Sequence, residues 1–438
     1  MPPPETASLG KYTDISVGMY TGSAHVNIPL FTLTEGPLAV PMSLSYQTSG
    51  VQVGEPASMT GLGWSLNAGG RIMRTVVGKP DEAINGYSSR GATYAGVPNM
   101  NPNFPLQPGT SNYEAVEGIA TGLFDGEADV FSFSFGGWSG KFYLKADART
   151  TGDAVVLVPQ QNIRIEPHFT SNPSLTGLRG FTVTTPDGVK YYFGIAPGNE
   201  TPVVEELQSF TAGSSGSIFI TAWMLLRIES FDATSRIDFS YTEERYGYKN
   251  RASCDTRLWS GNGCPDWQHF KVITRRLQRI SSLDKTVELI GSTPREDLRY
   301  FNEQFITDQH AKRLDSIKIT DNNVLCKRFD FTYDYWKDQT QYATGEPEDK
   351  RLRLLSVQER SCDGSIAIPP YSIQYYGTDY LPNRLSRAID HWGYYNGAEA
   401  QNNHNDPNLP PINETITYTG TPRTNPGNNA VQNTGDPI

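Results

Sequence analysis

Apolar and polar residues alternate along much of the chain, which is the pattern of β-strands buried on one face. The clearest examples are residues 38–46 and residues 129–135, the second of which places Phe131, Phe133 and Phe135 on one face. Short clusters of Gly, Pro, Asn and Asp separate such stretches and indicate tight turns. The pattern predicts an all-β fold of serial antiparallel hairpins, packed as sandwich-like or partly solenoidal sheets with at most one or two short helices.

A loose repeat runs through the second half of the chain. Each unit has an apolar strand, a turn rich in Asp, Asn or Gly, and a second strand that ends in Tyr. The units are residues 226–241, 313–333 and 352–375, and residues 276–280 look like a further first half. Each unit predicts a hairpin, and hairpins in series predict an extended sheet.

One segment predicts a helix instead. Residues 293–296 fit a capping box with Pro294 at the first helical position. The apolar residues that follow share one helical face, and they are Leu298, Phe301, Phe305 and Ile306.

Residues 61–72 predict a sharp corner in the β-structure. The stretch holds four glycines beside a tryptophan and an asparagine. Glycine reaches positive φ without strain and lets another strand approach closely. Trp64 is expected to supply buried area, with Ser65 or Asn67 as hydrogen-bond partners for its indole N–H or for the local backbone. The residues of this signature are Gly61, Gly63, Trp64, Asn67, Gly69 and Gly70.

The chain divides into five segments by composition. Residues 8–75 form a first β unit with the corner, and residues 76–120 are polar, without periodicity, and predict a long loop or insertion. Residues 121–250 are a hairpin region, and residues 251–397 hold the repeat-like hairpins. Residues 398–438 form a polar, extended tail.

Charge and hydropathy exclude some partners. The formal net charge of −10 argues against nucleic acid and anionic membranes, because phosphate binding needs clustered positive charge. No apolar run approaches the ~18 residues that a membrane span requires. The first residues lack the features of a signal peptide, and the polar far end has no evident boundary, so we expect a piece of a longer protein.

The cysteines predict at most one disulfide. Cys254 and Cys264 flank a Gly- and Asn-containing loop that could close as a bridge, with free thiols as the alternative. Zinc would need two closer pairs of ligands, and His269 alone does not complete a site. Cys326 and Cys362 fall in separate predicted strands and are expected to be free, buried thiols.

No catalytic constellation is evident, so we expect a protein that is not an enzyme and has no cofactor. The chain lacks a nucleophile elbow, a zinc-protease helix motif and a phosphate-binding glycine loop. Its six histidines are dispersed. Asp390 and His391 are adjacent, but neighbours on a strand point to opposite faces, so a structural role is favoured over a general base.

Three alternating carboxylates could hold calcium. Asp125, Glu127 and Asp129 precede a predicted strand, and their oxygens suit Ca²⁺. A solvated acidic face that protects a sheet edge explains the same residues and is favoured. Trp64, Trp138 and Trp392 could stack on sugars, although tryptophan in a β-corner belongs to the core more often.

An ordered set of motifs resembles the N-terminal region of large secreted RHS/YD-repeat proteins of the Bacteroidota. The match runs from about Tyr12 to Gly397 and covers nearly the whole chain. Its motifs are Thr21-Gly-Ser-Ala-His-Val-Asn-Ile-Pro-Leu30, Leu44-Ser-Tyr46, the corner at 61–70, Glu127-Ala-Asp-Val-Phe-Ser-Phe133 with Gly140-Lys-Phe142, Asp187-Gly-x-x-Tyr191-Tyr-Phe-Gly194, Arg313-Leu-Asp-Ser-Ile317, Leu381-Pro382 and Asp390-His391-Trp392-Gly393-Tyr-Tyr-Asn-Gly397.

The resemblance implies a region upstream of the YD repeats, which in related toxin-complex proteins and teneurins wind into a shell around a C-terminal cargo. It implies export through the outer membrane, commonly by the type 9 system, to the surface or the medium. The partners it implies are the downstream repeats of the same polypeptide and secretion or carrier components. No catalytic residue carries over.

We therefore expect a non-catalytic scaffold or plug for toxin delivery, interbacterial competition or surface attachment. The alternatives are a glycan-binding or glycan-processing surface module, and a secreted passenger bound to its export machinery.

Overall fold

The computed structural model describes most of the chain between residues 16 and 395. The described ranges are 16–17, 24–47, 50, 52–83, 85–90, 111–145, 154–170, 177–211, 214–251, 267–300, 309–322, 324–338, 344–361, 368–375, 381–386, 389 and 393–395. Strands dominate them, and α3 (Ser111–Ala120) is the one α-helix within these ranges. The prediction of an all-β fold is confirmed.

The strands follow the alternating pattern of the sequence. They are β1 (Ser16–Val17), β2 (Ala24–Glu35), β3 (Leu38–Gln47), β4 (Trp64–Ala68), β5 (Gly70–Thr75), β6 (Val130–Phe135), β7 (Trp138–Leu144), β8 (Val155–Val158), β9 (Arg164–Phe169), β10 (Leu178–Thr184), β11 (Lys190–Phe193), β12 (Val204–Thr211), β13 (Ser214–Glu229), β14 (Arg236–Arg251), β15 (Trp267–Ser281), β16 (Lys285–Ile290), β17 (Arg299–Tyr300), β18 (Ser316–Asp321), β19 (Val324–Lys337), β20 (Lys350–Ser361) and β21 (Tyr371–Ser372). Two 3₁₀ turns, η2 (Tyr87–Arg90) and η4 (Pro347–Asp349), accompany them.

The first four strands form a separate antiparallel sheet. Their order is β1-β2-β3-β4, and β2 and β3 form a hairpin with its turn at Gly36. Gly69 ends β4 with a φ of 103°, and the next strand, β5, joins a different sheet by pairing with β6 and β13. The predicted corner is therefore confirmed as the passage between two sheets.

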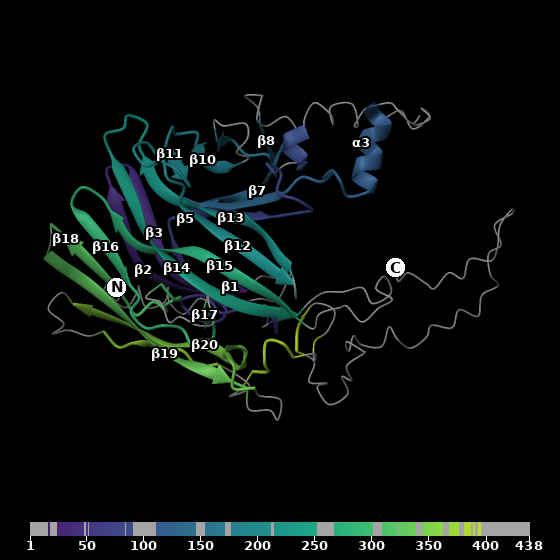
Figure 1. Ribbon diagram of the computed structural model, residues 1–438. Helices are drawn as coiled ribbons and strands as arrows, with labels where there is room; N and C mark the ends of the chain where they lie inside the picture. Colours follow the sequence, from purple (N-terminus) through teal and green to yellow (C-terminus); the bar gives the residue numbers. More distant parts are fainter. Residues whose placement is uncertain are drawn as a thin grey trace.

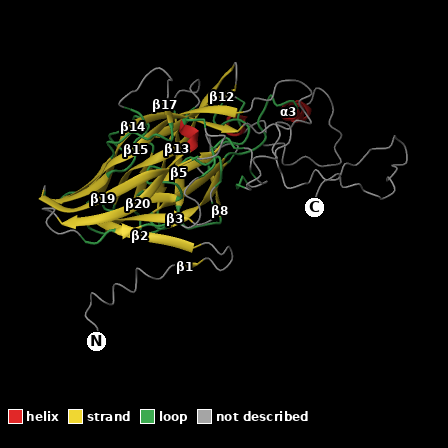
Figure 2. Ribbon diagram, turned by 90° about the horizontal axis from the view of Figure 1, so that it is seen from below, coloured by secondary structure: helices red, strands yellow, loops and turns green. Residues whose placement is uncertain are grey.

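The other strands form one continuous network of antiparallel pairs. β13 pairs with β12 and β14, and β15 pairs with both of these, so the four strands close a circuit. From β15 the network continues through β16, β18, β19 and β20 to β21 (Figures 1 and 2). The repeat units of the sequence are successive hairpins of this sheet, as expected.

One hydrophobic core spans both sheets. Its aromatic centre is a stack in which the rings of Phe131 and Phe142 lie 4.9 Å apart, with Phe181 edge-on to both. Trp223 from β13 packs edge-on against Phe181 at 5.1 Å. The three phenylalanines that the alternation of β6 places on one face are all buried in this core.

The helix predicted after Thr293 is wrong for the part that the structure describes. Residues 293–298 are not helical, and Arg299–Tyr300 is strand β17, while Phe301, Phe305 and Ile306 lie outside the described residues. Arg295 N–H donates to the carbonyl of Ala311 and Arg313 N–H donates to that of Thr293. These contacts with a distant segment override the local capping signal.

Helix α3 lies inside the segment that was expected to be a loop, so that expectation is wrong for residues 111–120. Among the described residues, no helix is long and apolar enough to cross a membrane.

Candidate functional site

Four segments far apart in sequence meet around the first half of β20. We call this meeting point the β20 junction, and it comprises residues 52–64, 293–299, 346–354 and 381–386. Leu62 N–H donates to the carbonyl of Leu352 at 2.9 Å, so the corner lies along the edge of β20 that β19 leaves open. Gly61 makes this approach possible, because a Cβ there would lie 3.1 Å from the backbone nitrogen of Leu354. Its φ of 106° also favours glycine.

Trp64 anchors the corner through a partner from the far end of the described chain. Its indole N–H donates to the hydroxyl of Tyr375 at 2.8 Å, and that hydroxyl donates to the carbonyl of Leu354 at 2.8 Å. The ring of Tyr46 packs 5.1 Å from the Trp64 ring. The expectation that Ser65 or Asn67 would satisfy the indole is wrong, since the partner comes from another hairpin.

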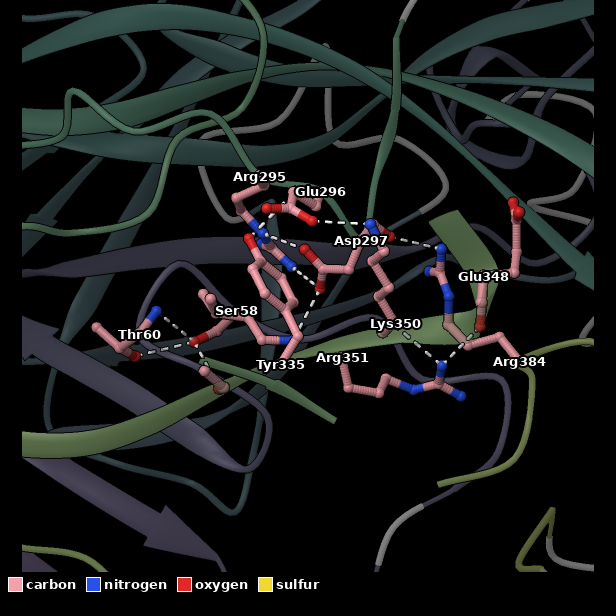
Figure 3. Close-up of polar contacts among 12 residues, drawn as sticks. Ser58, Thr60, Arg295, Glu296, Asp297, Tyr335, Glu348, Lys350, Arg351 and Arg384 are labelled. Atoms are coloured by element: carbon pink, nitrogen blue, oxygen red, sulfur yellow. Dashed lines mark hydrogen bonds and ion pairs between the residues drawn. The ribbon is translucent and has the colours of Figure 1, made fainter. Parts of the chain in front are cut away.

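The corner loop is also closed by short local hydrogen bonds. The hydroxyl of Ser58 donates to the carbonyl of Trp64 at 2.6 Å and contacts the hydroxyl of Thr60 at 2.9 Å (Figure 3). These bonds fix the loop that presents Leu62 to β20.

Asp297 is the acidic centre of the junction. Its carboxylate accepts two hydrogen bonds from Arg295, at 3.0 and 2.6 Å, and one from the Leu352 N–H at 3.2 Å (Figure 3). Burial alone would raise the pKa of Asp297, but the charge and hydrogen bonds of Arg295 outweigh burial and hold the pKa below its ordinary value. Asp297 therefore stays ionised and ties residues 295–297 to β20.

Glu348 forms the second buried ion pair. Arg299 donates to both of its carboxylate oxygens at 2.7 Å, which is the bidentate geometry that makes such pairs strong. Burial opposes ionisation of Glu348, but Arg299 outweighs it and holds the pKa of Glu348 below its ordinary value. This pair joins β17 to η4.

Arg351 and Arg384 are buried without a carboxylate of their own. Arg351 is 1% exposed and donates to the carbonyls of Val53, Glu348 and Lys350, and Arg384 is 2% exposed and donates to the carbonyl of Asp297. Within the described residues, neither guanidinium has a carboxylate oxygen within 4.0 Å. Burial, with the charge of Arg384, lowers the pKa of Arg351 to about 9. Arg351 thus joins backbone carbonyls from different segments, and Arg384 ties its own segment to Asp297.

Two further carboxylates lie buried beside Asn383. Asp349 accepts from the Asn383 amide at 2.6 Å, and Asp338 accepts from the Asn383 N–H at 3.0 Å. Four arginines and four acids therefore lie in or beside the junction with little exposure, namely Arg295, Arg299, Arg351 and Arg384 with Asp297, Asp338, Glu348 and Asp349. Such a charge-balanced and desolvated set holds segments in register, and it is costly to break at one member.

A second buried polar cluster holds one of the three proposed calcium ligands, Asp129. Asp129 accepts from the N–H groups of Val77 and Asp81, at 2.9 and 3.0 Å, and Asp81 accepts from the Asp129 N–H at 2.9 Å. Arg74 binds Glu82 at 2.6 Å and lies 3.6 Å from Asp129.

The pKa values of this cluster are raised. Burial, with the charge of Asp129, raises the pKa of Asp81 to about 8. Burial also raises the pKa of Asp129 to about 6, against the opposing Val77 N–H and Arg74. A protonated Asp81 relieves the excess of three acids over one arginine at this point.

Asp125, Glu127 and Asp129 are not brought together as a ligand set. Asp125 is buried and accepts from the Lys79 N–H at 2.8 Å, whereas Glu127 is exposed. In the part of the chain that the structure describes, no group of three or more His, Cys, Asp or Glu side chains is arranged to hold a metal ion. Asp125 and Asp129 instead fasten residues 77–81 to the start of β6.

The remaining signature residues have structural surroundings. Gly63 faces the Tyr46 ring, Gly69 faces Phe239 and Gly70 faces Phe135, each too close for a Cβ. Asn67 is exposed and donates to Ser45 at 3.1 Å. Trp138 is half-buried against the core, and the carbonyl of Gly393 accepts from the Val53 N–H at 2.9 Å.

Several predicted residues lie outside the described part of the chain. They are Cys254, Cys264, Cys362, Asp390, His391 and Trp392. Cys326 is exposed, so the expectation that it is buried is wrong.

The sequence gives little indication that the charged residues of the junction are buried. Arg351 and Leu352 are neighbours on β20, and both are buried, so the strand start is covered on both faces. An alternating Arg-Leu pattern is typical of a half-exposed strand, and it therefore hides a buried arginine.

No protein family model matches the chain. No curated protein sequence matches it either. Among solved structures, the chain is similar to the N-terminal domain of the effector protein SpvB from Salmonella typhimurium strain LT2, with a TM-score of 0.39 and 12% sequence identity. The superposition covers 77% of this chain and 98% of that one.

Proposed function

We propose that the chain is a non-catalytic scaffold from the region upstream of the YD repeats in a secreted RHS-type protein. Its role is to hold a stack of hairpins in fixed register for a protein used in toxin delivery, interbacterial competition or surface attachment. The proposal joins the ordered motifs of the sequence to the arrangement of the hairpins.

The observation that carries the proposal is the sealing of β20 on both edges. β19 covers one edge along the whole strand. On the other edge, the corner meets Leu352, and residues 368–373 pair with positions 355–359. Because the corner at residues 61–72 covers an edge of β20, that edge is not left open for pairing with another chain. This arrangement favours a role in holding the sheet in a fixed register.

The buried charges support a structural role. Arg295 and Arg299 hold the pKa values of Asp297 and Glu348 below their ordinary values and engage both carboxylates, so these two acids are poorly suited to proton transfer. Trp64 is buried, which counts against its use as a sugar-stacking surface.

Cross-linking mass spectrometry of the native protein, purified from its producing cells with a lysine-reactive reagent, tests the proposal. Lys327 and Lys337 on β19 should form cross-links to residues further downstream in the same polypeptide. Lys141 on β7 serves as the comparison site. A chain without downstream repeats, linked to a glycan or a separate receptor, would contradict the proposal. So would turnover of an ester, peptide or glycoside that a Glu or Asp substitution abolishes.

A further inference from the structure

Five hairpin turns form a continuous row along one edge of the molecule, which we call the turn row. It consists of residues 185–189, 230–235, 35–37 and 282–284, together with 321–322 and 324. The turns follow one another down the left-hand edge of Figure 1. They come from both sheets, so no single hairpin or repeat unit accounts for the row.

Contacts between neighbouring turns establish the row. A Cβ on Gly188 would lie 2.5 Å from the Phe231 ring, and a Cβ on Gly36 would lie 2.2 Å from the Ser235 hydroxyl oxygen. The Leu283 N–H donates to the Glu35 carboxylate at 3.0 Å. The Asn322 N–H donates to the carbonyl of Asp284 at 2.8 Å. Each turn therefore touches the next.

The turn row carries strongly exposed apolar side chains. Leu283 is 84% exposed, Phe231 is 82% exposed and Val324 is 65% exposed. Turns need Gly, Asn, Asp or Pro for their geometry, so a large apolar residue at the tip has no role in forming the turn. Exposed apolar groups gathered at one place on a surface mark an interaction site.

The same turns supply the charge of the surface. Each carries one carboxylate and no lysine or arginine, and these acids are Glu35, Asp187, Asp232, Asp284 and Asp321. Lys190, Arg236 and Lys285 lie in the strands that follow, and Arg236 is paired with Asp238 at 2.7 Å. The tips are therefore acidic, which disfavours an anionic lipid surface and favours a basic partner.

We propose that the turn row is a docking surface for a protein segment that presents apolar side chains flanked by lysine or arginine, such as one face of a basic amphipathic helix. Phe231, Leu283 and Val324 supply the apolar contacts. The five carboxylates select the charge of the partner and speed its approach. This surface is separate from the β20 junction, so the proposal does not depend on the scaffold's family.

The test uses a fluorescently labelled amphipathic helical peptide, with Leu on one face and Lys on the other, as the probe. A peptide of the same length with Glu in place of Lys is its counterpart. The Lys/Leu peptide should bind with an affinity that falls as salt rises, and the Glu/Leu peptide should not bind. The triple variant Phe231→Ser, Leu283→Ser, Val324→Ser should weaken binding at least about tenfold. Variants Asp232→Asn, Asp284→Asn and Asp321→Asn, which keep the side-chain oxygen acceptor, should weaken binding mainly at low salt.

A matched control replaces exposed apolar residues elsewhere, with Ile218→Ser, Leu123→Ser and Val156→Ser. These changes should leave peptide binding unchanged. Equal loss in the control, or equal binding of the Glu/Leu peptide, would overturn the proposal. Binding to phosphatidylcholine or phosphatidylserine vesicles that the turn-row variant abolishes would also overturn it, in favour of a lipid surface.

Discussion

Trp64 and Tyr375 lie 311 residues apart in the chain, and the Trp64 indole N–H donates to the Tyr375 hydroxyl at 2.8 Å. The same hydroxyl donates to the carbonyl of Leu354. One hydroxyl group thus joins the corner between the two sheets to β20 and to the chain that follows β21. This bond links the early and late parts of the described fold directly.

Replacing Tyr375 with Phe should destabilise the protein by about 1–3 kcal/mol, because the Trp64 N–H and the Leu354 carbonyl each lose a partner in a mostly buried place. Urea denaturation followed by tryptophan fluorescence measures the change. Tyr371→Phe is the control, since Tyr371 is exposed and its substitution should change stability by less than about 0.5 kcal/mol. Equal effects of the two variants would contradict the bridging role of Tyr375.

Gly61→Ala should be more costly than a substitution at a glycine with open surroundings. Gly61 has a φ of 106°, and a Cβ added there would lie 3.1 Å from the backbone nitrogen of Leu354. Gly137→Ala is the matched control, because Gly137 has a φ of 84° and no atom within 4 Å of a Cβ. We expect about 1 kcal/mol for Gly137→Ala and at least about 2 kcal/mol more for Gly61→Ala, measured as unfolding free energies. Similar losses would show that the approach to β20 is not tight.

Asp297→Asn should destabilise the protein by about 3–5 kcal/mol, because it leaves Arg295 buried without its counter-charge. The exposed pair of Arg164 and Glu166 provides the comparison, with side chains 73% and 40% exposed. Glu166→Gln should cost no more than about 1 kcal/mol. Thermal and urea unfolding of both variants measure the difference, and a small effect at Asp297 would remove the basis for treating it as the centre of the junction.

The hairpins could be predicted from the sequence because they depend on local signals. Alternation in β6 and β7 and the turn at Gly136 and Gly137 are sufficient to specify that pair. The corner could also be predicted, since its glycines are required by its own backbone. The junction could not, because Asp297, Glu348 and Arg384 acquire their partners only after distant strands pair. The helix predicted at residues 293–298 failed for the same reason, because contacts with residues 311–313 override the local capping-box pattern.

Stability should fall as pH rises through the range in which Asp81 ionises in the folded protein. Its pKa is raised from the unfolded value to about 8, so the folded state holds the proton more tightly. The stabilisation is complete below the unfolded pKa and is lost as pH rises through the folded pKa. Between about pH 6 and pH 9 we expect a loss of roughly 2–4 kcal/mol from Asp81.

Asp81→Asn separates this effect from other titrations, because the amide oxygen can still accept from the Asp129 N–H. The variant should have a flatter dependence of stability on pH over the same range. An unchanged slope would assign the pH dependence to other groups. Urea midpoints measured at several pH values, with the wild-type protein alongside, give the comparison.

The central claim is that the corner and β20 form one cooperative unit held by the buried junction, and hydrogen exchange tests it most directly. Peptides covering residues 52–64 and 350–357 should exchange slowly in the native protein. Asp297→Asn should speed exchange in both peptides together, because the backbone N–H of Leu352 bonds Asp297 and its carbonyl bonds Leu62. Peptides from β6 and β7 should keep their protection. Faster exchange in only one of the two regions would contradict the claim, because the corner and β20 would then be independent.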